Sequence, residues 1–420
     1  SAKRERSENA KRSKRRHLKG VFEAKLQKQM EYLKKNSTSV FVDVHKGTKV
    51  LKTIEMPQFE MKASSFVRKS TVIYGTSGSG KTYLIRDIMY LLKDRFPRVW
   101  VFCPTNAQNQ MYTGIVPEPL IYDTVTLEII SDIYEYQEMA RQIYDTANKI
   151  ETLRKLFMRI PENSKAILFE TKLINLRKTA MSEIDAEQNG VKREELKDKL
   201  DALMNEKLCS HYKQFIGANI SRLAGMDLTE DEKYSLKYIG YCPDSLVIFD
   251  DAMTEVAEVI KRGKKEENPA VQNFFFKGRH ILISTIYALQ SEKMFDPALR
   301  KNTFTSIFTS SDEAMGYFGK SSNGFAAEEK RDAQACITTL FSPEHKPTHK
   351  KLVYLKDCEK KYQYVIAQPH TRFPMCGKSV RDYCKKIEEK SKSIDKKSKF
   401  AKKFCDYAGG HSGNRFTGSP

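Results

Sequence analysis

Runs of apolar residues predict the strands of this protein. Residues 40–44 and 49–54 alternate between apolar and polar positions around a turn at Gly47, which predicts a β-hairpin. Other runs are almost wholly apolar and rich in β-branched residues, as in strands that are buried on both faces. These runs are 71–74, 98–103, 245–249, 280–287 and 304–309. Residues 352–355 and 362–367 predict a second hairpin, which extends the sheet.

Helical spacing dominates between these runs. Apolar residues recur every three or four positions over 83–92, and again through a long segment at about 126–240. In that segment Pro161 ends one run, and Asn189-Gly190 breaks a second run at about 165–215. We expect a helical hairpin or small bundle that is inserted into the fold. It serves either packing alone or contact with DNA, another subunit or a capsid, and the sequence leaves these roles open.

Strands that alternate with helices predict an α/β fold with a mostly parallel central sheet. We divide the chain into a basic tail (1–20), an arm and hairpin (21–55), a core with the helical insertion (56–370) and a second basic tail (371–420). Residues 21–34 carry helical spacing and predict a short amphipathic arm.

Composition and charge restrict the classes of function. The chain has 420 residues and 40% hydrophobic content, with no apolar run of about 18 residues and no apolar centre of a signal peptide near its start. We therefore expect a cytosolic or nuclear protein with no membrane span and no secretion. Eight scattered cysteines form no C-x-x-C pair, which favours reduced thiols over a zinc site in the Cys- and His-containing C-terminal part.

The net charge of +20 is concentrated near the two ends. Residues 1–20 hold nine Lys or Arg against two acidic residues, and residues 378–403 hold eleven against four, so each stretch contributes +7. Such stretches suit a polyanion, most simply nucleic acid, because Lys and Arg replace the counterions of phosphates. The alternative is a solvated tail or a localisation signal.

The strongest chemical motif follows the strand at 71–74. Its Gly-x-x-x-x-Gly-Lys-Thr spacing, between a strand and a helix, is that of a phosphate-binding loop, with backbone N–H groups and a helix N-terminus facing the phosphates. Lys81 would reach the β- and γ-phosphates of ATP, and Thr82 would hold Mg²⁺. The predicted nucleotide-binding residues are Gly75, Thr76, Ser77, Gly78, Ser79, Gly80, Lys81 and Thr82.

Two acidic residues end the apolar strand at 245–249, as in a Walker B strand. We expect Asp250 to hold Mg²⁺ through water and Asp251 to orient or deprotonate the attacking water, with Glu255 as the next candidate base. Gln290 ends the strand at 280–287, where a polar side chain can sense the γ-phosphate. We expect this strand to lie between the Walker A and Walker B strands.

Two arginines flank the strand at 280–287. Arg279 and Arg300 are both candidates for an arginine finger, which neutralises charge in the transition state. A finger that acts in trans requires an oligomer. The alternative for each is a surface or DNA-contacting charge.

These motifs together resemble the genome-packaging ATPases of large DNA viruses, the poxvirus-type branch of the FtsK/HerA superfamily. The resemblance covers residues 56–369 and is carried by the phosphate loop, the strand at 99–105, residues 248–252, the Lys277-Gly-Arg-His280 stretch with its strand to Gln290, and residues 299–302. Position 251 is Asp where many such ATPases carry Glu, and the helical insertion is longer than the family core needs.

The resemblance implies a homo-oligomeric ring, a pentamer or hexamer, that uses ATP and Mg²⁺ to push double-stranded DNA into a preformed capsid. It implies capsid or portal-vertex proteins as partners, and the virion or a virus factory in the host cytoplasm as the location. It also favours Arg300 over Arg279 as the finger. Two alternatives are a helicase or AAA-type remodelling ATPase, and a basic DNA-binding structural protein that binds ATP without turnover.

Overall fold

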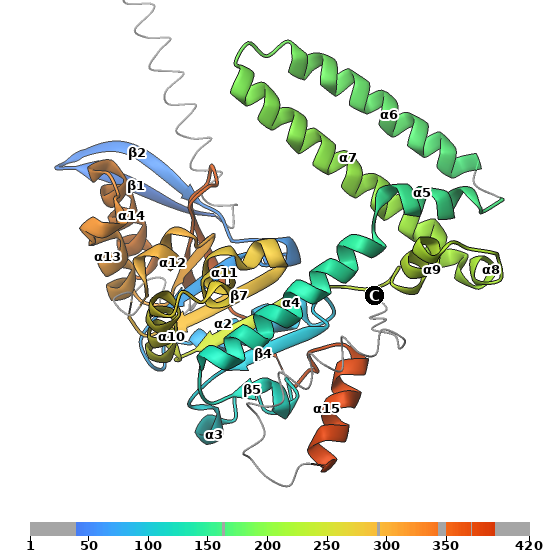
Figure 1. Cartoon of the computed structure of the whole chain (residues 1–420). Helices are drawn as coiled ribbons and strands as arrows, with labels where there is room; N and C mark the ends of the chain where they lie inside the picture. The colour runs from blue at the N-terminus through green and yellow to red at the C-terminus, as the bar shows by residue number, and fades with distance from the viewer. Residues whose placement is uncertain (1–38, 162–163, 292–294, 343–349, 371, 391–420) are drawn as a thin grey trace, which may run out of the picture. The chain divides into compact units, whose positions relative to one another are not determined.

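The computed structural model describes residues 39–161, 164–291, 295–342, 350–370 and 372–390. The basic stretch 1–20, the arm at 21–34 and residues 391–420 therefore lie outside the described residues. The described residues form two compact units. Of the described residues, unit 1 comprises those at 39–65, 70–88 and 286–370, and unit 2 comprises those at 66–69, 89–285 and 372–390. Figure 1 gives the labels of the elements used below.

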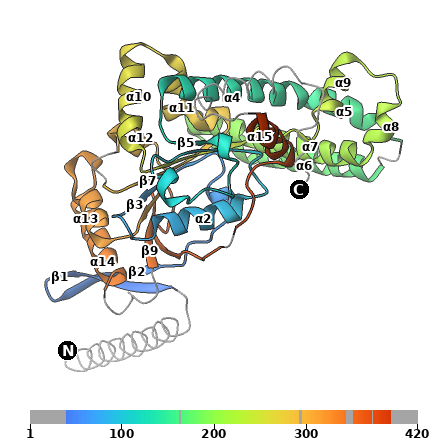
Figure 2. The same cartoon turned by 90° about the horizontal axis from the view of Figure 1, so that it is seen from below.

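Unit 1 contains both predicted hairpins. Strands β1 (Val40–Lys46) and β2 (Lys49–Met56) pair antiparallel, and α14 (Ala327–Leu340) lies along them (Figure 2). Strand β8 (Thr305–Phe308) pairs in parallel with β3 (Ser70–Tyr74). On its other side β8 continues antiparallel into the second hairpin. The strands of that hairpin are β9 (Lys350–Leu355) and β10 (Tyr362–Ile366).

Unit 2 contains the acidic strand and its neighbours. Strand β4 (Arg98–Phe102) pairs in parallel with both β6 (Ser245–Asp250) and β5 (Ile121–Tyr122). Every residue of β4 and β6 is buried, which explains their continuous apolar sequences. The predicted strand at 280–287 is β7 (Ile283–Leu289), which contributes residues to both units.

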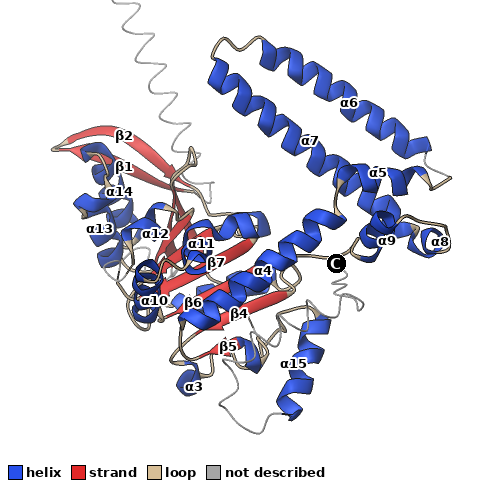
Figure 3. Ribbon diagram, viewed as in Figure 1, coloured by secondary structure: helices blue, strands red, loops and turns tan. Residues whose placement is uncertain are grey.

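The strand order is β10-β9-β8-β3-β7-β6-β4-β5, with β9 antiparallel to its neighbours and the other described pairings parallel. Figure 3 labels β7, β6, β4 and β5 among the red strands. Strand β7 is thus the extra strand between the phosphate-loop strand β3 and the acidic strand β6, as predicted. The fold is α/β, with a mostly parallel mixed sheet.

The predicted helical insertion lies within unit 2. Its longest helices, α6 (Ser164–Asp185) and α7 (Gly190–Ala218), lie side by side as an antiparallel hairpin (Figure 1). Asn189 caps α7, its side chain accepting a hydrogen bond from the N–H of Lys192, which explains the predicted break. The other helices of the insertion are α4 (Leu127–Ala147), α5 (Ile150–Met158), α8 (Ile220–Ala224) and α9 (Glu230–Lys237).

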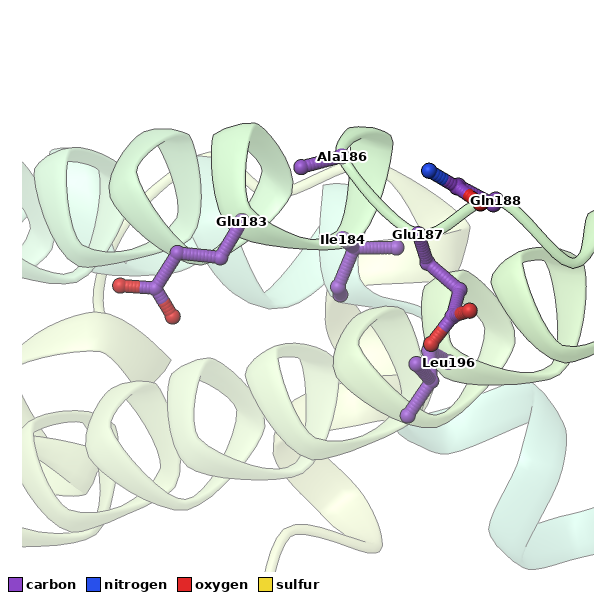
Figure 4. A pocket seen from close by; sticks show the side chains of 6 residues that line it. All are labelled: Glu183, Ile184, Ala186, Glu187, Gln188 and Leu196. Atoms are coloured by element: carbon purple, nitrogen blue, oxygen red, sulfur yellow. The ribbon is translucent and has the colours of Figure 1, made fainter.

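The base of the insertion has a hydrophobic cluster of its own. It includes Leu153, Phe157, Tyr212 and Ile216, all almost fully buried. Away from this cluster the hairpin exposes several large apolar side chains, such as Leu168 and Leu176. Near the turn of the hairpin a hollow is lined by three polar or acidic residues and three apolar residues (Figure 4). The lining residues are Glu183, Ile184, Ala186, Glu187, Gln188 and Leu196.

Part of the predicted C-terminal tail is folded. Residues Lys378–Lys390 form α15, in which Val380 and Cys384 are fully buried within unit 2. Its apolar residues fall on one face despite the high lysine content, so the helix packs by an amphipathic stripe. The remaining helices of unit 2 that follow β6 are α10 (Met253–Lys265) and α11 (Pro269–Lys277).

Candidate nucleotide-binding site

The predicted phosphate loop connects β3 to α2 (Lys81–Leu92) in unit 1. Gly78 and Gly80 have φ angles of +76° and +88°, in the left-handed region that glycine adopts without a steric penalty. Thr76, Ser77 and Gly78 at the apex of the loop are exposed. The segment is therefore a strand, a glycine-dependent turn and a helix start, as a phosphate-binding loop requires.

The start of the loop is held by residues from two other strands of unit 1. The N–H of Gly75 donates to the carbonyl of Leu289 at 3.1 Å, and the N–H of Thr309 donates to the carbonyl of Tyr74 at 2.9 Å. A Cβ atom on Gly75 would lie 1.7 Å from Oγ1 of Thr309, so only glycine fits this position. The hydroxyls of Ser79 and Thr309 are 2.6 Å apart and share a hydrogen bond. Thr309 is thus hydrogen-bonded to Tyr74 before the turn and to Ser79 near its end.

Lys81 and Thr82 occupy the first turn of α2. The Lys81 side chain is buried, and its Nζ donates to the carbonyls of Gly75 at 2.7 Å and Thr76 at 3.1 Å. Thr82 is half-buried. The first backbone N–H groups of an α-helix have no acceptor within the helix, so they remain for an anion. This donor set fits a polyphosphate, and the Thr82 hydroxyl suits a hard cation such as Mg²⁺.

Gln290 directly follows β7 and is exposed. The preceding residue, Leu289, accepts the hydrogen bond from Gly75, so the backbone brings Gln290 beside the start of the phosphate loop. This placement agrees with a side chain that senses the nucleotide.

In unit 2 the carboxylate of Asp250, the predicted Walker B residue, is held by a tyrosine. Oδ2 of Asp250 accepts a hydrogen bond of 2.8 Å from the hydroxyl of Tyr112, and both side chains are buried. Burial and the nearby charge of Asp250 raise the pKa of Tyr112 well above its ordinary value, so the hydroxyl stays protonated and donates. Burial also raises the pKa of the neighbouring Cys103 thiol to about 11, which leaves it unreactive.

The second acidic residue has a strained backbone. Asp251 has a φ of +54°, which non-glycine residues adopt rarely and mostly where the surrounding structure enforces it. Its Oδ1 atom is buried and has no hydrogen-bond partner among the described residues. A carboxylate oxygen in this state fits a water molecule or a hydrated cation. Glu255, the other candidate base, lies in the first turn of α10.

The two candidate arginine fingers lie in different environments. Arg300, in α12 (Pro297–Lys301), is 6% exposed, and its guanidinium donates to Asn323 Oδ1 and to the carbonyl of Phe295, each at 2.8 Å. A finger that acts on a neighbouring subunit must extend from the surface, so this placement does not suit the role predicted for Arg300. Arg279 is exposed in the 3-10 helix Gly278–Ile281, which follows α11.

Sequence reasoning missed Thr309 beside the phosphate loop and Tyr112 beside Asp250. Thr309 is the last residue of the predicted strand 304–309, and β8 ends beside β3 only because of the sheet order, which local patterns do not contain. Tyr112 lies in a loop 138 residues from its partner Asp250. Neither residue belongs to a motif with fixed spacing.

Within the described ranges no group of three or more His, Cys, Asp or Glu side chains is arranged to hold a metal ion. None of the helices in these ranges combines the length and the apolar character needed to cross a membrane.

Solved structures match this chain with low TM-scores. The conjugation coupling protein TcpA of pCW3, solved with ATPγS, matches with 12% identity and a TM-score of 0.34, covering 86% of this chain and 72% of that chain. The genome packaging NTPase B204 from Sulfolobus turreted icosahedral virus 2, in complex with ATPγS, matches with 11% identity and a TM-score of 0.31, covering 74% and 99%.

No protein family model matches the chain. Sequence comparison finds relatives among viral proteins of uncharacterised function. The protein B354L of African swine fever virus (isolate Pig/Kenya/KEN-50/1950) is 29% identical over 365 residues, which cover 83% of this chain and 96% of B354L. The protein L437 of Acanthamoeba polyphaga mimivirus is 29% identical over 85 residues, covering 20% of this chain and 29% of L437. The chain is thus similar in sequence to nearly the whole of a viral protein.

Proposed function

We propose that this protein is an ATP-driven translocase of double-stranded DNA that packages a viral genome into a capsid. The observation that carries the proposal is the phosphate loop, in which Thr309 leaves room only for glycine at position 75 and Lys81 is buried against the loop carbonyls. The viral relatives and the two basic stretches support a role with viral DNA.

ATP and Mg²⁺ fit the residues described above. In the proposed site, the loop N–H groups and Lys81 bind the phosphates, while Thr82 and Asp250 hold Mg²⁺, the latter through water. Bound Mg²⁺ supplies charge neutralisation at the transferred phosphoryl group. Tyr112 keeps the Asp250 carboxylate in one orientation by its hydrogen bond.

Asp251 is the proposed general base for hydrolysis. Its buried oxygen without a described partner is suited to accept a proton from the attacking water, and the strained backbone fixes the carboxylate's direction. Gln290 would orient the same water or sense the γ-phosphate from its place beside Gly75. Asp251 directly follows β6 and Gln290 directly follows β7, so the end of a strand fixes the position of each residue.

The proposed motor is a homo-oligomeric ring, a pentamer or hexamer, that docks on capsid or portal-vertex proteins. Arg279 is the proposed trans finger, because it is exposed whereas Arg300 is enclosed in its own subunit. The basic residues at 1–20 and 378–403 are the proposed contacts to DNA phosphates.

Displacement of a third strand from a DNA triplex tests translocation directly. We expect the full chain to displace the third strand with ATP, and the Lys81→Ala variant to fail. Unwinding of a forked duplex without triplex displacement would instead indicate a helicase. DNA binding with ATP turnover below about 0.1 per second, which is low on the usual enzyme scale, would favour the structural alternative.

The basic stretch at 1–20 is tested by its removal. We expect the shortened protein to bind DNA more weakly, with a smaller dependence of affinity on salt, because fewer counterions are released. An unchanged salt slope would assign this stretch another role.

A further inference from the structure

A second lysine lies against the phosphate loop. Lys351 belongs to β9, and its side chain is 6% exposed. A Cβ atom placed on Gly80 would lie 3.3 Å from Nζ and 3.7 Å from Cε of Lys351. The ammonium end of the side chain therefore lies over the last turn of the loop, at the residue that precedes Lys81.

The end of the Lys351 side chain occupies space that is open because position 80 is glycine. Any side chain at position 80 would crowd Lys351 as well as strain the backbone at a φ of +88°. The positive φ alone favours glycine at position 80, and a Cβ atom there would also press against the flexible end of the Lys351 side chain. The phosphate-loop motif accounts for the turn but not for the close approach of Lys351.

The buried ammonium group of Lys351 beside the loop favours the binding of an anion. Burial lowers the pKa of Lys351, because the charged form is disfavoured where water is excluded. Lys81 lies against the same loop, and two like charges on one turn repel each other. A polyphosphate chain bound by the loop brings several negative charges to the two ammonium groups. It therefore favours the charged form of Lys351 and offsets the repulsion between Lys351 and Lys81.

We propose that Lys351 is a second phosphate-binding lysine, which contacts the phosphate chain of the nucleotide together with Lys81. The inference rests on the proposed nucleotide site and adds to it a residue outside the phosphate-loop motif. Lys351 enters from β9, the antiparallel strand, whereas Lys81 enters from α2. The recognised ligand is the polyphosphate, not the base.

The neighbouring Lys350 provides a matched control. It lies on the same strand, and successive side chains of a strand point to opposite faces of the sheet. Its Nζ lies 4.8 Å from the centre of the Tyr364 ring rather than beside the loop. Substitution of Lys350 removes the same charge from the same strand without touching the loop.

The test is calorimetric titration of the full-length protein with ATP and with inorganic tripolyphosphate, both with Mg²⁺. We expect Lys351→Met to weaken both ligands by about 10-fold to 100-fold, the range for loss of one charge-assisted hydrogen bond. Lys351→Arg keeps the charge and should retain most of the affinity, and Lys350→Met should bind as the wild type does. A Lys351→Met protein that melts earlier but binds tripolyphosphate normally would overturn the inference.

A second measurement needs no variant. Lysine acylation of the wild type, followed by mass spectrometry, should show slower modification of Lys351 when tripolyphosphate is added, with Lys350 unaffected. An unchanged rate at Lys351 would contradict the inference. Loss of ATP binding in Lys81→Ala but not in Lys351→Met would overturn only the role of Lys351, whereas a wild type that binds no ATP would overturn the proposed function itself.

Discussion

Charged side chains have different partners in the phosphate loop and in the helical insertion. Lys81 is buried at the loop and donates to backbone carbonyls, which leaves its positive charge uncompensated by those contacts. In the insertion, Arg159 binds both oxygens of Glu232 at 2.8 and 2.9 Å, and Arg154 binds Glu170 at 2.7 Å. In both pairs the glutamate is the buried member and the arginine is partly exposed. The buried carboxylates of the insertion are thus paired within the fold, whereas the buried ammonium of Lys81 meets only dipoles and is available to a ligand.

The two regions also differ in backbone conformation. Positive φ angles occur at Gly78 and Gly80 in the loop and at Asp251 after β6. Across the described residues of the insertion, 127–161 and 164–240, no residue has a positive φ. Positive φ angles thus occur at strand ends that carry proposed chemical residues, whereas the described part of the insertion has a regular backbone.

Substitution of the proposed base should have the largest effect on turnover among variants that still bind ATP. We expect Asp251→Asn to lower kcat by about 1000-fold, within the range for loss of a general base, while ATP affinity changes little. The control is Glu255→Gln, which should turn over normally. Both quantities come from steady-state kinetics and calorimetric titration. Normal turnover in Asp251→Asn together with loss in Glu255→Gln would move the base to Glu255.

Glycine substitutions compare the two regions directly. We expect Gly75→Ala to abolish ATP binding and to destabilise the protein by about 1–3 kcal/mol, because its Cβ would overlap Oγ1 of Thr309. The matched change Gly217→Ala in α7 meets no atom within 4 Å and should stabilise by about 0.5–1 kcal/mol. Thermal melting and ATP titration measure both effects. Equal stability changes would show that the loop is not packed as described.

Loss of the tyrosine hydroxyl that orients Asp250 should have an intermediate effect. We expect Tyr112→Phe to lower kcat by about 10-fold and to raise the Mg²⁺ concentration needed for half-maximal rate, because the Asp250 carboxylate loses its donor. The control is Tyr122→Phe, another buried tyrosine of unit 2, whose ring stacks on Phe102. Identical Mg²⁺ dependence in Tyr112→Phe and wild type would refute this positioning role.

The smallest effect concerns an ion pair of the insertion and depends on pH. Burial alone would raise the pKa of Glu232, but hydrogen bonds from Arg159 and Thr229 outweigh it and lower that pKa. A lowered folded pKa means that the stabilisation is present above the unfolded value of about 4.3 and is lost as pH falls through the folded value. We expect Glu232→Gln to lower Tm by about 2–4 °C at pH 7.

That difference in Tm should shrink as the pH falls below about 4, because Glu232 of the wild type then becomes protonated. Glu230→Gln, an exposed change in the same helix turn, serves as the control and should behave as the wild type at each pH. A difference in Tm that persists unchanged in acid would contradict the ion-pair explanation.

Local patterns predicted most elements but not all of their limits. The expected strand at 280–287 begins instead at Ile283, because residues Gly278–Ile281 form a 3-10 turn and Leu282 has a φ of +65°. Apolar periodicity cannot distinguish such a turn from a strand. The two-residue strand Ile121–Tyr122 is too short to produce a pattern.

The candidate site was predictable where its residues are adjacent in sequence. The loop at 75–82 and the acidic pair after β6 follow fixed spacings, which a single sequence displays. Thr309 and Lys351 reach the phosphate loop, and Tyr112 reaches Asp250, through sheet pairing and loop packing between distant segments, which no spacing encodes. The resemblance favoured Arg300 as the finger. The sequence could not show that Arg300 is buried, because its burial depends on the residues that pack around α12 in the fold.

Steady-state ATP hydrolysis by the wild type and by Lys81→Ala, with and without double-stranded DNA over a salt series, tests the central claim most directly. The account predicts turnover above about 0.1 per second that DNA stimulates, that salt weakens and that Lys81→Ala abolishes. Tight DNA binding with no turnover in either protein would contradict it.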